Sequence, residues 1–599
     1  MIKLSDYVFK FIADLGINYV FFLPGGGCMH LVDSLGKNKK LKYICFLHEQ
    51  AAVIASDAYA QYTNNLGVAL VTTGPGSTNA ITGVVGAWID SVPLLVISGQ
   101  VKRPDMIGDS FLRQRGVQEV NIIPIVKPIT KYAVTILEPE SIRYHLEKAV
   151  YLARNGRPGP VWIDIPLDVQ AGMIDEKKLK RFEPSELPKT KNKELEILVD
   201  KTIQLINQSE RPVILAGNGV RLSAALDDFL KLIRYLKIPV LTTWKAIDFL
   251  AEDDPLFFGR PGSIAQRGAN FILQNSDLIL TIGARLDLAQ VGYNYKNFSP
   301  CAKKIVVDID PEEIKKLKMD IEIKICADAK DFIKELLKQK EKIILKDRTT
   351  WFNYCKTQKE KYPVVLPEYW KKKKFVNTYV LIEVLSQLMK NNDLLIPGSS
   401  GSCSEITMQA FKVKKGQRIF NNPGLGAMGY GLPASIGACL ASGKKRTISI
   451  IGDGGLQVNI QELETLKRLN LPIKIFVLNN NGYASIRNTQ RNYFKGHLVG
   501  CDPSSGLTLP DICKVASAYG LKNFRILNHK NIKKKIKKVL ETKGPVICEV
   551  KIDPDLLTAP RLSSEVKPDG SIVSKPLEDL WPFLDREELK ANMIAISKE

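Results

Sequence analysis

The stretch Thr447–Ile486, TISIIGDGGLQVNIQELETLKRLNLPIKIFVLNNNGYASI, decides the fold of this 599-residue chain. It has the pattern of a buried strand, a glycine turn, a helix, a second buried strand and an asparagine-rich loop. Two parallel strands joined through a helix are the unit from which doubly wound α/β sheets are built. The stretch therefore predicts a parallel sheet covered by helices.

Polar groups in this stretch gather where the two strands end. Gly452, Gly454 and Gly455 allow the backbone to approach a phosphate group, and the following helix directs free N–H groups toward it. Asp453 and Asn480 end neighbouring strands, so a carboxylate and an amide oxygen come together. Mg²⁺ takes such oxygens together with diphosphate oxygens and water. A simple turn explains the glycines alone, but the Asp453–Asn480 spacing favours a metal–diphosphate site.

The alternation of short apolar runs and amphipathic helices continues along the chain and predicts two more such units. The runs outside the opening stretch are VFFL, LKYICFL, GVALVTT, PLLVISG and GPVWIDIP, then RPVILAGNG, IPVLTTW, SDLILTIGARL and KKIVVDIDP, then NDLLIPG and GPVICEVKID. The charged stretch DEKKLKRFEPSELPKTKNKE reads as a linker. We expect three doubly wound parallel-sheet α/β domains over residues 1–175, 190–340 and 370–555, followed by a surface tail over 556–599.

Composition excludes several classes of protein. The net charge is +22, but aromatic residues are not interleaved with the lysine runs, so a nucleic-acid partner is not expected. No stretch approaches the roughly 20 apolar residues of a membrane span. The first residues form an amphipathic helix with an acidic side chain, unlike a signal peptide. The ten cysteines form no CxxC pair, which suits a reducing cytoplasm.

Further segments, together with the opening stretch, carry a resemblance to a known family. They are FFLPGGG, FLHEQAAVIASDAYA, TTGPGSTNAITGVVGAWIDSVPLLVISGQV, VKPITKYAV, GRPGPVWIDIPLDVQ, FGRPG and LGAMGYGLPASIGA. With them the chain resembles, over nearly its full length, the acetolactate synthase branch of the enzymes that depend on thiamine diphosphate (ThDP). The resemblance implies a pyrimidine-binding first domain, a central domain and a diphosphate-binding third domain. It also implies a homodimer or homotetramer with active sites at the subunit interface.

The resemblance assigns roles to individual residues. Asp453 and Asn480 are implied as Mg²⁺ ligands, joined by the backbone carbonyl of Gly482. Glu49, which opens the helix EQAAVIASDAYA, is implied to hydrogen-bond the cofactor's aminopyrimidine and so activate it, whereas its position alone also fits a carboxylate facing the helix dipole. Met428 is implied to support the bent cofactor. Other positions expected around the cofactor are Gly26, Gly74, Asn79, Gln100, Gly426, Gly452, Gly454, Gly455 and Tyr483.

The implied reaction is decarboxylation of a 2-keto acid, with pyruvate as the donor. Family members that release an aldehyde carry an adjacent His-His pair, which this sequence lacks, so we expect ligation of the two-carbon unit to a second carbonyl. Gln118 and Lys131 are the candidate catalytic residues on the substrate side, with a solvated Lys131 as an equal alternative. Acetolactate synthases carry Phe-Gln-Glu in this segment, where this chain has Val117-Gln118-Glu119. The extra residues SFLRQRG come just before them, so the resemblance implies an altered acceptor pocket.

Several alternatives stay open at this point. The acceptor is a second pyruvate, or a nucleotide-linked keto sugar of surface-polysaccharide biosynthesis, since the tail resembles relatives of that kind. A flavin-dependent oxidase and a catalytically silent nucleotide-binding homologue are further alternatives. The presence of Glu49, Asp453 and Asn480 together argues against a silent homologue, which has no chemical reason to retain all three. FAD in the central domain is also open: Arg285, Asp308 and Asp310 are the candidate contacts, but the family's second arginine is missing and a surface role for Arg285 is the alternative.

Overall fold

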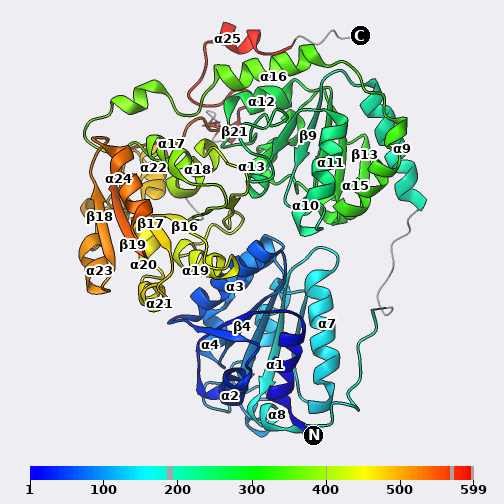
Figure 1. Cartoon of the computed structure of the whole chain (residues 1–599), viewed down its shortest axis with the longest axis vertical. Helices are drawn as coiled ribbons and strands as arrows, with labels where there is room; N and C mark the ends of the chain where they lie inside the picture. Colours follow the sequence, from blue (N-terminus) through cyan, green and yellow to red (C-terminus); the bar gives the residue numbers. More distant parts are fainter. Residues whose placement is uncertain (185–192, 399–400, 567–568, 570–571, 595–599) are drawn as a thin grey trace.

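A computed structural model describes residues 1–184, 193–398, 401–566, 569 and 572–594 (Figure 1). Three parallel sheets with helices between their strands follow one another along the chain. The predicted class, three doubly wound α/β units, is therefore confirmed. Much of the predicted linker, residues 185–192, lies outside the described residues.

The first sheet has six parallel strands in the order β3-β2-β4-β5-β7-β6. Its strands are β2 (Tyr19–Phe22), β3 (Lys42–Cys45), β4 (Gly67–Val71), β5 (Leu94–Gln100), β6 (Tyr132–Thr135) and β7 (Pro160–Pro166). Its helices include α1 (Leu4–Asp14), α2 (Met29–Lys37), α3 (Glu49–Thr63), α4 (Pro75–Asn79), α5 (Ile81–Ile89), α6 (Ile122–Val126) and α7 (Ile142–Arg154). Strands β4, β5 and β7 are buried along their whole length, as a parallel sheet between helices requires.

The third sheet has the order β15-β14-β16-β17-β19-β18, which matches the first sheet strand for strand. Its strands are β14 (Leu394–Pro397), β15 (Arg418–Ile419), β16 (Thr447–Gly452), β17 (Ile473–Asn479), β18 (Lys522–Ile526) and β19 (Val546–Lys551). Its helices are α17 (Thr378–Leu388), α18 (Ser402–Ala410), α19 (Gly431–Ala441), α20 (Asp453–Gln457), α21 (Glu462–Arg468), α22 (Ala484–Tyr493), α23 (Ile512–Ala518) and α24 (Ile532–Glu541).

The central sheet has five parallel strands in the order β10-β9-β11-β12-β13. Its strands are β9 (Pro212–Ala216), β10 (Val240–Thr242), β11 (Leu278–Ile282), β12 (Lys303–Asp308) and β13 (Ile323–Cys326). Its helices include α9 (Lys193–Gln208), α10 (Gly219–Leu222), α11 (Leu226–Leu236), α12 (Arg267–Gln274), α14 (Pro311–Lys315), α15 (Ala329–Lys338) and α16 (Thr349–Lys361).

Each sheet reverses its strand order between its first and third strands. Ligands of open α/β sheets bind outside the carboxyl ends of the strands at this point. Glycine-rich turns follow the strands there: Gly25–Gly27 after β2, Gly452–Gly455 after β16 and Gly217–Gly219 after β9. The topology thus places a candidate site at one edge of each sheet.

The apolar pattern does not predict the strands β6, β13, β15 and β18. All four lie at sheet edges. Their residues are only partly buried, with β6 half-buried throughout and β13 alternating between buried and exposed. An edge strand needs no continuous apolar run, because it lacks a neighbour on one side and less of its surface is covered.

Helices α3 and α19 join the first and third units, and Figure 1 shows them side by side between the two sheets. A Cβ atom on Gly437 would lie 2.0 Å from the backbone oxygen of Ala55, so only glycine permits this approach. Beside this contact, the Gln61 amide donates to the Asp57 carboxylate (2.8 Å) and to the Tyr430 hydroxyl (3.1 Å). The pair is therefore fixed by close packing and by buried hydrogen bonds.

The tail is more embedded than a surface tail. Leu562, Leu577 and Leu580 are buried in the apolar core of the central unit. A two-stranded antiparallel ribbon, β20 (Ser564–Val566) with β21 (Ile572–Ser574), and helix α25 (Arg586–Ala591) complete it. The Pro and Gly content that indicates a loop does not reveal the leucines that anchor it.

Candidate active site

Asp453 lies at the carboxyl edge of the third sheet, where strand β16 ends and α20 begins. Its side chain is buried, and its two carboxylate oxygens accept the backbone N–H groups of Gly454 (2.9 Å) and Gly482 (3.1 Å). Burial raises the pKa of this carboxyl to about 6, although these backbone hydrogen bonds act to lower it. The carboxylate therefore faces the turn that follows β17, as the spacing predicts.

Asn480, at the start of that turn, has a buried side-chain oxygen without a hydrogen-bond partner. The neighbouring Asn479 differs, because its side chain donates to Glu549 (2.6 Å) and accepts from Asn481 (3.0 Å). An unpaired buried amide oxygen is costly and indicates a missing ligand or water. The residues at this edge fit a hard cation, which takes carboxylate and amide oxygens.

Close contacts show why glycines surround this pair. Gly482 has a φ of +136°, and a Cβ there would lie 2.2 Å from the oxygen of Cys501. A Cβ on Gly454 would lie 2.2 Å from the ring of Tyr483. The space beside Gly452, by contrast, holds no heavy atom within 4 Å of its Cβ position, which leaves room for a ligand.

Glu49 lies at the equivalent edge of the first sheet, as the first residue of α3. Its carboxylate is 6% exposed and accepts a hydrogen bond from the Asn79 amide (3.1 Å). A Cβ on Gly76 would lie 3.3 Å from the same carboxylate. The predicted residues Glu49, Asn79 and the turn that begins at Gly74 are thus brought together.

The glycines of this edge are held by threonines. Gly27 donates its N–H to the Thr72 hydroxyl (3.1 Å), and a Cβ on Gly25 would lie 2.5 Å from the Thr72 side chain. The predicted cofactor contact Gly26 has open space at its Cβ position. Loop Pro24–Gly27 therefore lies against the turn after β4, where a cofactor ring would need a close backbone.

Gln100 ends β5, but its amide is already engaged. Its oxygen accepts from the hydroxyl of Thr73 (2.8 Å) and the N–H of Val101 (3.0 Å), and its nitrogen donates to the oxygen of Val120 (2.9 Å) and to Asp164 (3.3 Å). These bonds leave no free polar atom for a cofactor. The geometry indicates that Gln100 holds the loop that follows β5 in place and does not make the predicted contact with the cofactor.

Lys131 also has structural partners. Its ammonium donates to the backbone oxygens of Asn155 (2.6 Å) and Arg157 (2.7 Å), and burial lowers its pKa to about 8. The structure thus ties it to the turn before β7 and not to Glu49. Gln118, by contrast, lies near the Glu49 edge: its backbone oxygen is 3.3 Å from the Thr73 hydroxyl, and its φ is +64°.

Met428 lies in the loop ahead of α19 and is 37% exposed. Two glycines with positive φ flank it, Gly426 (+67°) and Gly429 (+86°). The oxygen of Gly429 accepts from the Asn459 amide (2.8 Å), which fixes the loop. A methionine held out by such a loop is available to a ligand, because a core methionine would be covered.

Two residues that organise the site were not predicted. Glu462, which is fully buried, accepts the N–H of Leu47 (3.0 Å) two residues before Glu49, and so links the third unit to the first. Glu119 is buried inside the loop after β5 and accepts three backbone N–H groups. Glu462 has no sequence signal, since acidic residues in a helix are ordinarily solvated. Glu119 belongs to the stretch Val117–Glu119 that aligns with the family's Phe-Gln-Glu, but its buried role was not predicted.

A cavity of about 700 Å³ lies at the carboxyl edge of the central sheet. Arg285 and Asp308 line it, but the Arg285 guanidinium already pairs with Glu313 (3.2 Å). Asp310 does not line the cavity; it caps α14 and pairs with Arg157 (2.8 Å). The prediction of Asp310 as a direct flavin contact is therefore not supported, because its carboxylate is used by the joint between two units.

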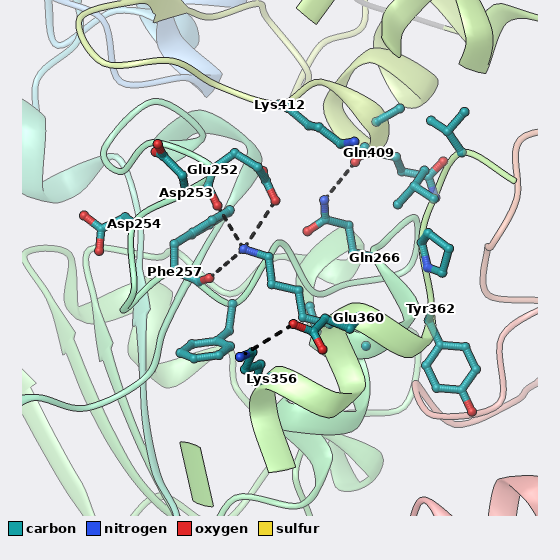
Figure 2. A pocket seen from close by; sticks show the side chains of 18 of the residues that line it. Glu252, Asp253, Asp254, Phe257, Gln266, Lys356, Glu360, Tyr362, Gln409 and Lys412 are labelled. Atoms are coloured by element: carbon teal, nitrogen blue, oxygen red, sulfur yellow. Dashed lines mark hydrogen bonds and ion pairs between the residues drawn. The ribbon is translucent and has the colours of Figure 1, made fainter. Parts of the chain in front are cut away.

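Figure 2 shows a second cavity, of about 720 Å³, between the central and third units. The charges that point into it are largely paired with one another. Lys359 donates to the backbone oxygens of Glu252 and Phe257, Lys356 pairs with Glu360, and Lys412 pairs with Glu383. It lacks the strand ends and glycine turns that mark the other sites, so we do not place chemistry there.

Among the described residues, no helix has the length and apolar character needed to cross a membrane.

Three family models match the chain. They are the N-terminal TPP binding domain (residues 2–125), the central domain (residues 199–336) and the C-terminal TPP binding domain (residues 399–550) of thiamine pyrophosphate enzymes. The chain is 35% identical to a probable acetolactate synthase large subunit of Methanocaldococcus jannaschii, over 92% of each chain. It is 33% identical to the acetolactate synthase large subunit of Cyanidium caldarium, over 89% of this chain and 90% of the relative. It is 32% identical to the chloroplastic acetolactate synthase 2 of Nicotiana tabacum, over 92% and 82%.

Proposed function

The chain belongs to the acetolactate synthase-like family of thiamine pyrophosphate enzymes, and from this premise we propose that it decarboxylates pyruvate and joins the two-carbon unit to a second carbonyl compound. It is a ThDP-dependent enzyme. When bound, ThDP supplies the electron sink that allows a 2-keto acid to lose CO₂. Relatives named acetolactate synthases support pyruvate as the donor.

The main observation that supports a Mg²⁺–diphosphate site is the free amide oxygen of Asn480 beside the buried Asp453. These two side chains and the carbonyl of Gly482 would hold Mg²⁺, and the glycines around them would admit the diphosphate. Magnesium fits because all three donors are hard oxygens. Amino-acid side chains alone do not complete the shell, so diphosphate and water oxygens would fill the remaining positions.

The first sheet would supply the activating group. Glu49 would hydrogen-bond the pyrimidine ring and hold its proton in place, and the Asn79 amide orients the Glu49 carboxylate for that contact. Met428, held out by its glycine loop, would support the cofactor from the third unit. Glu49 lies on the first unit and Met428 on the third. On the likeness to acetolactate synthases we propose that the first unit of one copy and the third unit of another form each active site, in a dimer or tetramer.

The acceptor is either a second pyruvate or a nucleotide-linked keto sugar. The names of the relatives support the first acceptor. The feature that would hold the nucleotide of the second acceptor is the central cavity, which extends from Asp308 at the central sheet to Gly424 and Ser485 beside the cofactor segments. A nucleotide fits the carboxyl edge of such a sheet. FAD also contains a nucleotide and would bind at the same edge. A flavin absorption spectrum of the purified protein distinguishes FAD from a nucleotide-linked substrate.

The decisive experiment incubates purified protein with ThDP, Mg²⁺ and pyruvate and measures CO₂ and acetolactate. We expect both products at enzymatic turnover, and an Asp453→Ala variant should form neither. An Asp555→Asn variant is the matched control, because that carboxylate is exposed and pairs with Arg491. Pyruvate consumption only when a keto sugar is added would favour the second acceptor. ThDP binding without turnover of any keto acid would overturn the proposal in favour of a silent homologue.

A further inference from the structure

Helix α22 follows the turn after β17 and carries a buried arginine, Arg487, which is 3% exposed. Its Nη2 atom donates to the backbone oxygens of Asn480 (3.1 Å) and Pro554 (2.9 Å). Asn480 directly follows β17, and Pro554 lies beyond the end of the neighbouring strand β19. Both oxygens are acceptors and cannot bond to each other, so the guanidinium supplies the donors that join the two strand ends.

A second segment covers the outside of the same turn. The backbone oxygen of Cys501 accepts the N–H of Tyr483 (2.8 Å) and lies 2.2 Å from the position a Cβ would occupy on Gly482. The next residue, Asp502, places its Oδ2 atom 3.7 Å from the Nη1 atom of Arg487. Arg487 therefore contacts the turn, the segment that covers it and the chain that leaves β19.

The burial of this guanidinium is only partly compensated. The Nε atom of Arg487 is buried without a hydrogen-bond partner, and the Asp502 carboxylate lies beyond hydrogen-bond distance. Buried ion pairs are often no more stabilising than apolar side chains of similar volume. Stability alone therefore does not account for an arginine here, whereas two carbonyl groups on different strand ends require a planar donor with N–H groups in fixed directions.

The residue that Arg487 holds is the candidate metal ligand. The guanidinium takes the main-chain oxygen of Asn480, while the side-chain oxygen of the same residue stays unpaired. At the other end of the turn, the N–H of Gly482 donates to the Asp453 carboxylate (3.1 Å). The turn is thus fixed at both ends. Groups that orient a metal ligand without touching the metal contribute strongly to metal affinity.

We propose that Arg487 is a positioning residue of the Mg²⁺ site, and that it holds the main chain of Asn480 so that the amide oxygen is available to the cation. This role rests on the proposed function, because it requires the Mg²⁺–diphosphate site at Asp453 and Asn480. A positive charge near a cation site opposes binding, and the Asp502 carboxylate beside Arg487 offsets that charge.

Mg²⁺ titrations of ThDP binding to the purified protein, followed by equilibrium dialysis, test this role without measuring turnover. Arg487→Met keeps an apolar side chain but removes the donors, and it should raise the Mg²⁺ concentration needed for half-maximal binding about 10–100-fold. Arg487→Lys should raise it less, because a flexible ammonium replaces part of the contact. Arg491→Met is the matched control: Arg491 lies on the same helix, is 43% exposed and pairs with Asp555, so the Mg²⁺ requirement should not change.

A double-mutant cycle separates positioning from a general loss of stability. If Arg487 acts through Asn480, then Arg487→Met should change the Mg²⁺ requirement much less in an Asn480→Ala background, because the ligand that it orients is already lost. Urea unfolding of the metal-free proteins identifies conditions in which every variant is folded. Should Arg487→Met not fold, Arg487→Lys replaces it in the same cycle.

The outcomes are distinct. A raised Mg²⁺ requirement that largely disappears in the Asn480→Ala background supports the proposal. An unchanged requirement in the folded variant, or an equal rise in both backgrounds, overturns it and leaves Arg487 with a structural role alone. ThDP binding to the wild-type protein that does not depend on Mg²⁺ would mean that the proposed metal site has failed. That failure is distinguishable, because it is seen without any variant.

Discussion

The first and third sheets have the same strand order, yet their carboxyl edges differ in chemistry. Strand β5 ends at Gln100 and β17 ends at Asn479, and both side-chain amides are engaged. The third edge differs in the next residue, Asn480, whose side-chain oxygen is free. The next strands carry paired acids: Asp164 lies opposite Ser98 in the register of β5 and β7, and Glu549 occupies the same place in β19. The topology therefore determines where a site can lie, whereas single side chains determine whether that edge binds a ligand or only stabilises the protein.

The pKa values of the two buried acids shift in opposite directions. Burial raises the pKa of the Asp164 carboxyl to about 7, against hydrogen bonds from the neutral Ser98, Thr135 and Gln100. Burial also acts to raise the pKa of Glu549, but its bonds to Lys551 and Arg525 lower it overall. The first edge thus buries a carboxyl among neutral partners, and the third pairs its carboxylate with cations.

The largest effect is expected from the activating acid of the first edge. Glu49→Gln should lower kcat by about 10²–10⁴-fold, because a neutral amide cannot take the proton role of the carboxyl. ThDP should still bind, since the diphosphate and metal are held by the third edge. Proton exchange at the thiazolium carbon, followed by NMR in D₂O, measures activation directly. Normal exchange in this variant would contradict the role of Glu49.

A smaller effect should distinguish Asn480, which follows β17, from Gln100, which ends β5. Asn480→Ala should weaken Mg²⁺ affinity about 10–100-fold, the loss seen when one contributor to a metal site is removed. Gln100→Ala should leave Mg²⁺ affinity unchanged and lower the free energy of unfolding by about 1–3 kcal/mol, because buried partners lose their hydrogen bonds. Mg²⁺ titrations of ThDP binding and denaturant unfolding measure the two quantities. Equal loss of Mg²⁺ affinity in both variants would refute the distinction.

The smallest effect concerns the dependence of stability on pH. The folded state keeps a proton on Asp164 that the unfolded chain releases above its ordinary pKa of 3.8, so the free energy of unfolding should fall as pH rises from about 4 to about 7. Asp164→Asn should flatten this decline. Glu549 has the opposite sign: its stabilisation is present above its ordinary pKa of 4.5 and is lost as pH falls below that value.

Glu549→Gln should therefore reduce the loss of stability at acid pH and leave the interval from 5 to 7 unchanged. Urea unfolding of both variants at a series of pH values measures the two slopes. Parallel slopes for wild type and Asp164→Asn between pH 4 and 7 would show that the buried carboxyl is ionised throughout, and would remove the contrast between the sheets.

The fold was predictable wherever strands are buried on both faces. The runs around β4, β5, β16 and β17 are continuous and apolar, so the pattern identifies them, whereas the edge strands β6, β13, β15 and β18 are too exposed for the pattern to identify. The paired site at Asp453 and Asn480 was predictable because both residues follow such strands. Their proximity follows from the rule that parallel strands end at one edge.

The sequence could not predict which polar side chains already have hydrogen-bond or ion-pair partners within the protein. Gln100 and Lys131 occupy positions that suggest contact with a ligand, but their partners are backbone groups that only the folded chain brings near. The buried role of Glu119 could not be predicted for the same reason, since its three donors come from a loop without periodicity. Asp310 pairs with Arg157 of the first unit, and Arg285 pairs with Glu313 within the central unit. No local pattern predicts either ion pair.

The approach of α3 to α19 has a consequence for how the chain can be divided. The face of α3 that meets α19 consists of small side chains, among them Ala51, Ala52 and Ala55, which are completely buried. A fragment containing the first unit alone would present this smooth apolar face to water, and the third unit alone would present the matching groove at Gly437. We therefore expect the first and third units to be soluble only when they are joined in one chain, even though each has a complete sheet of its own.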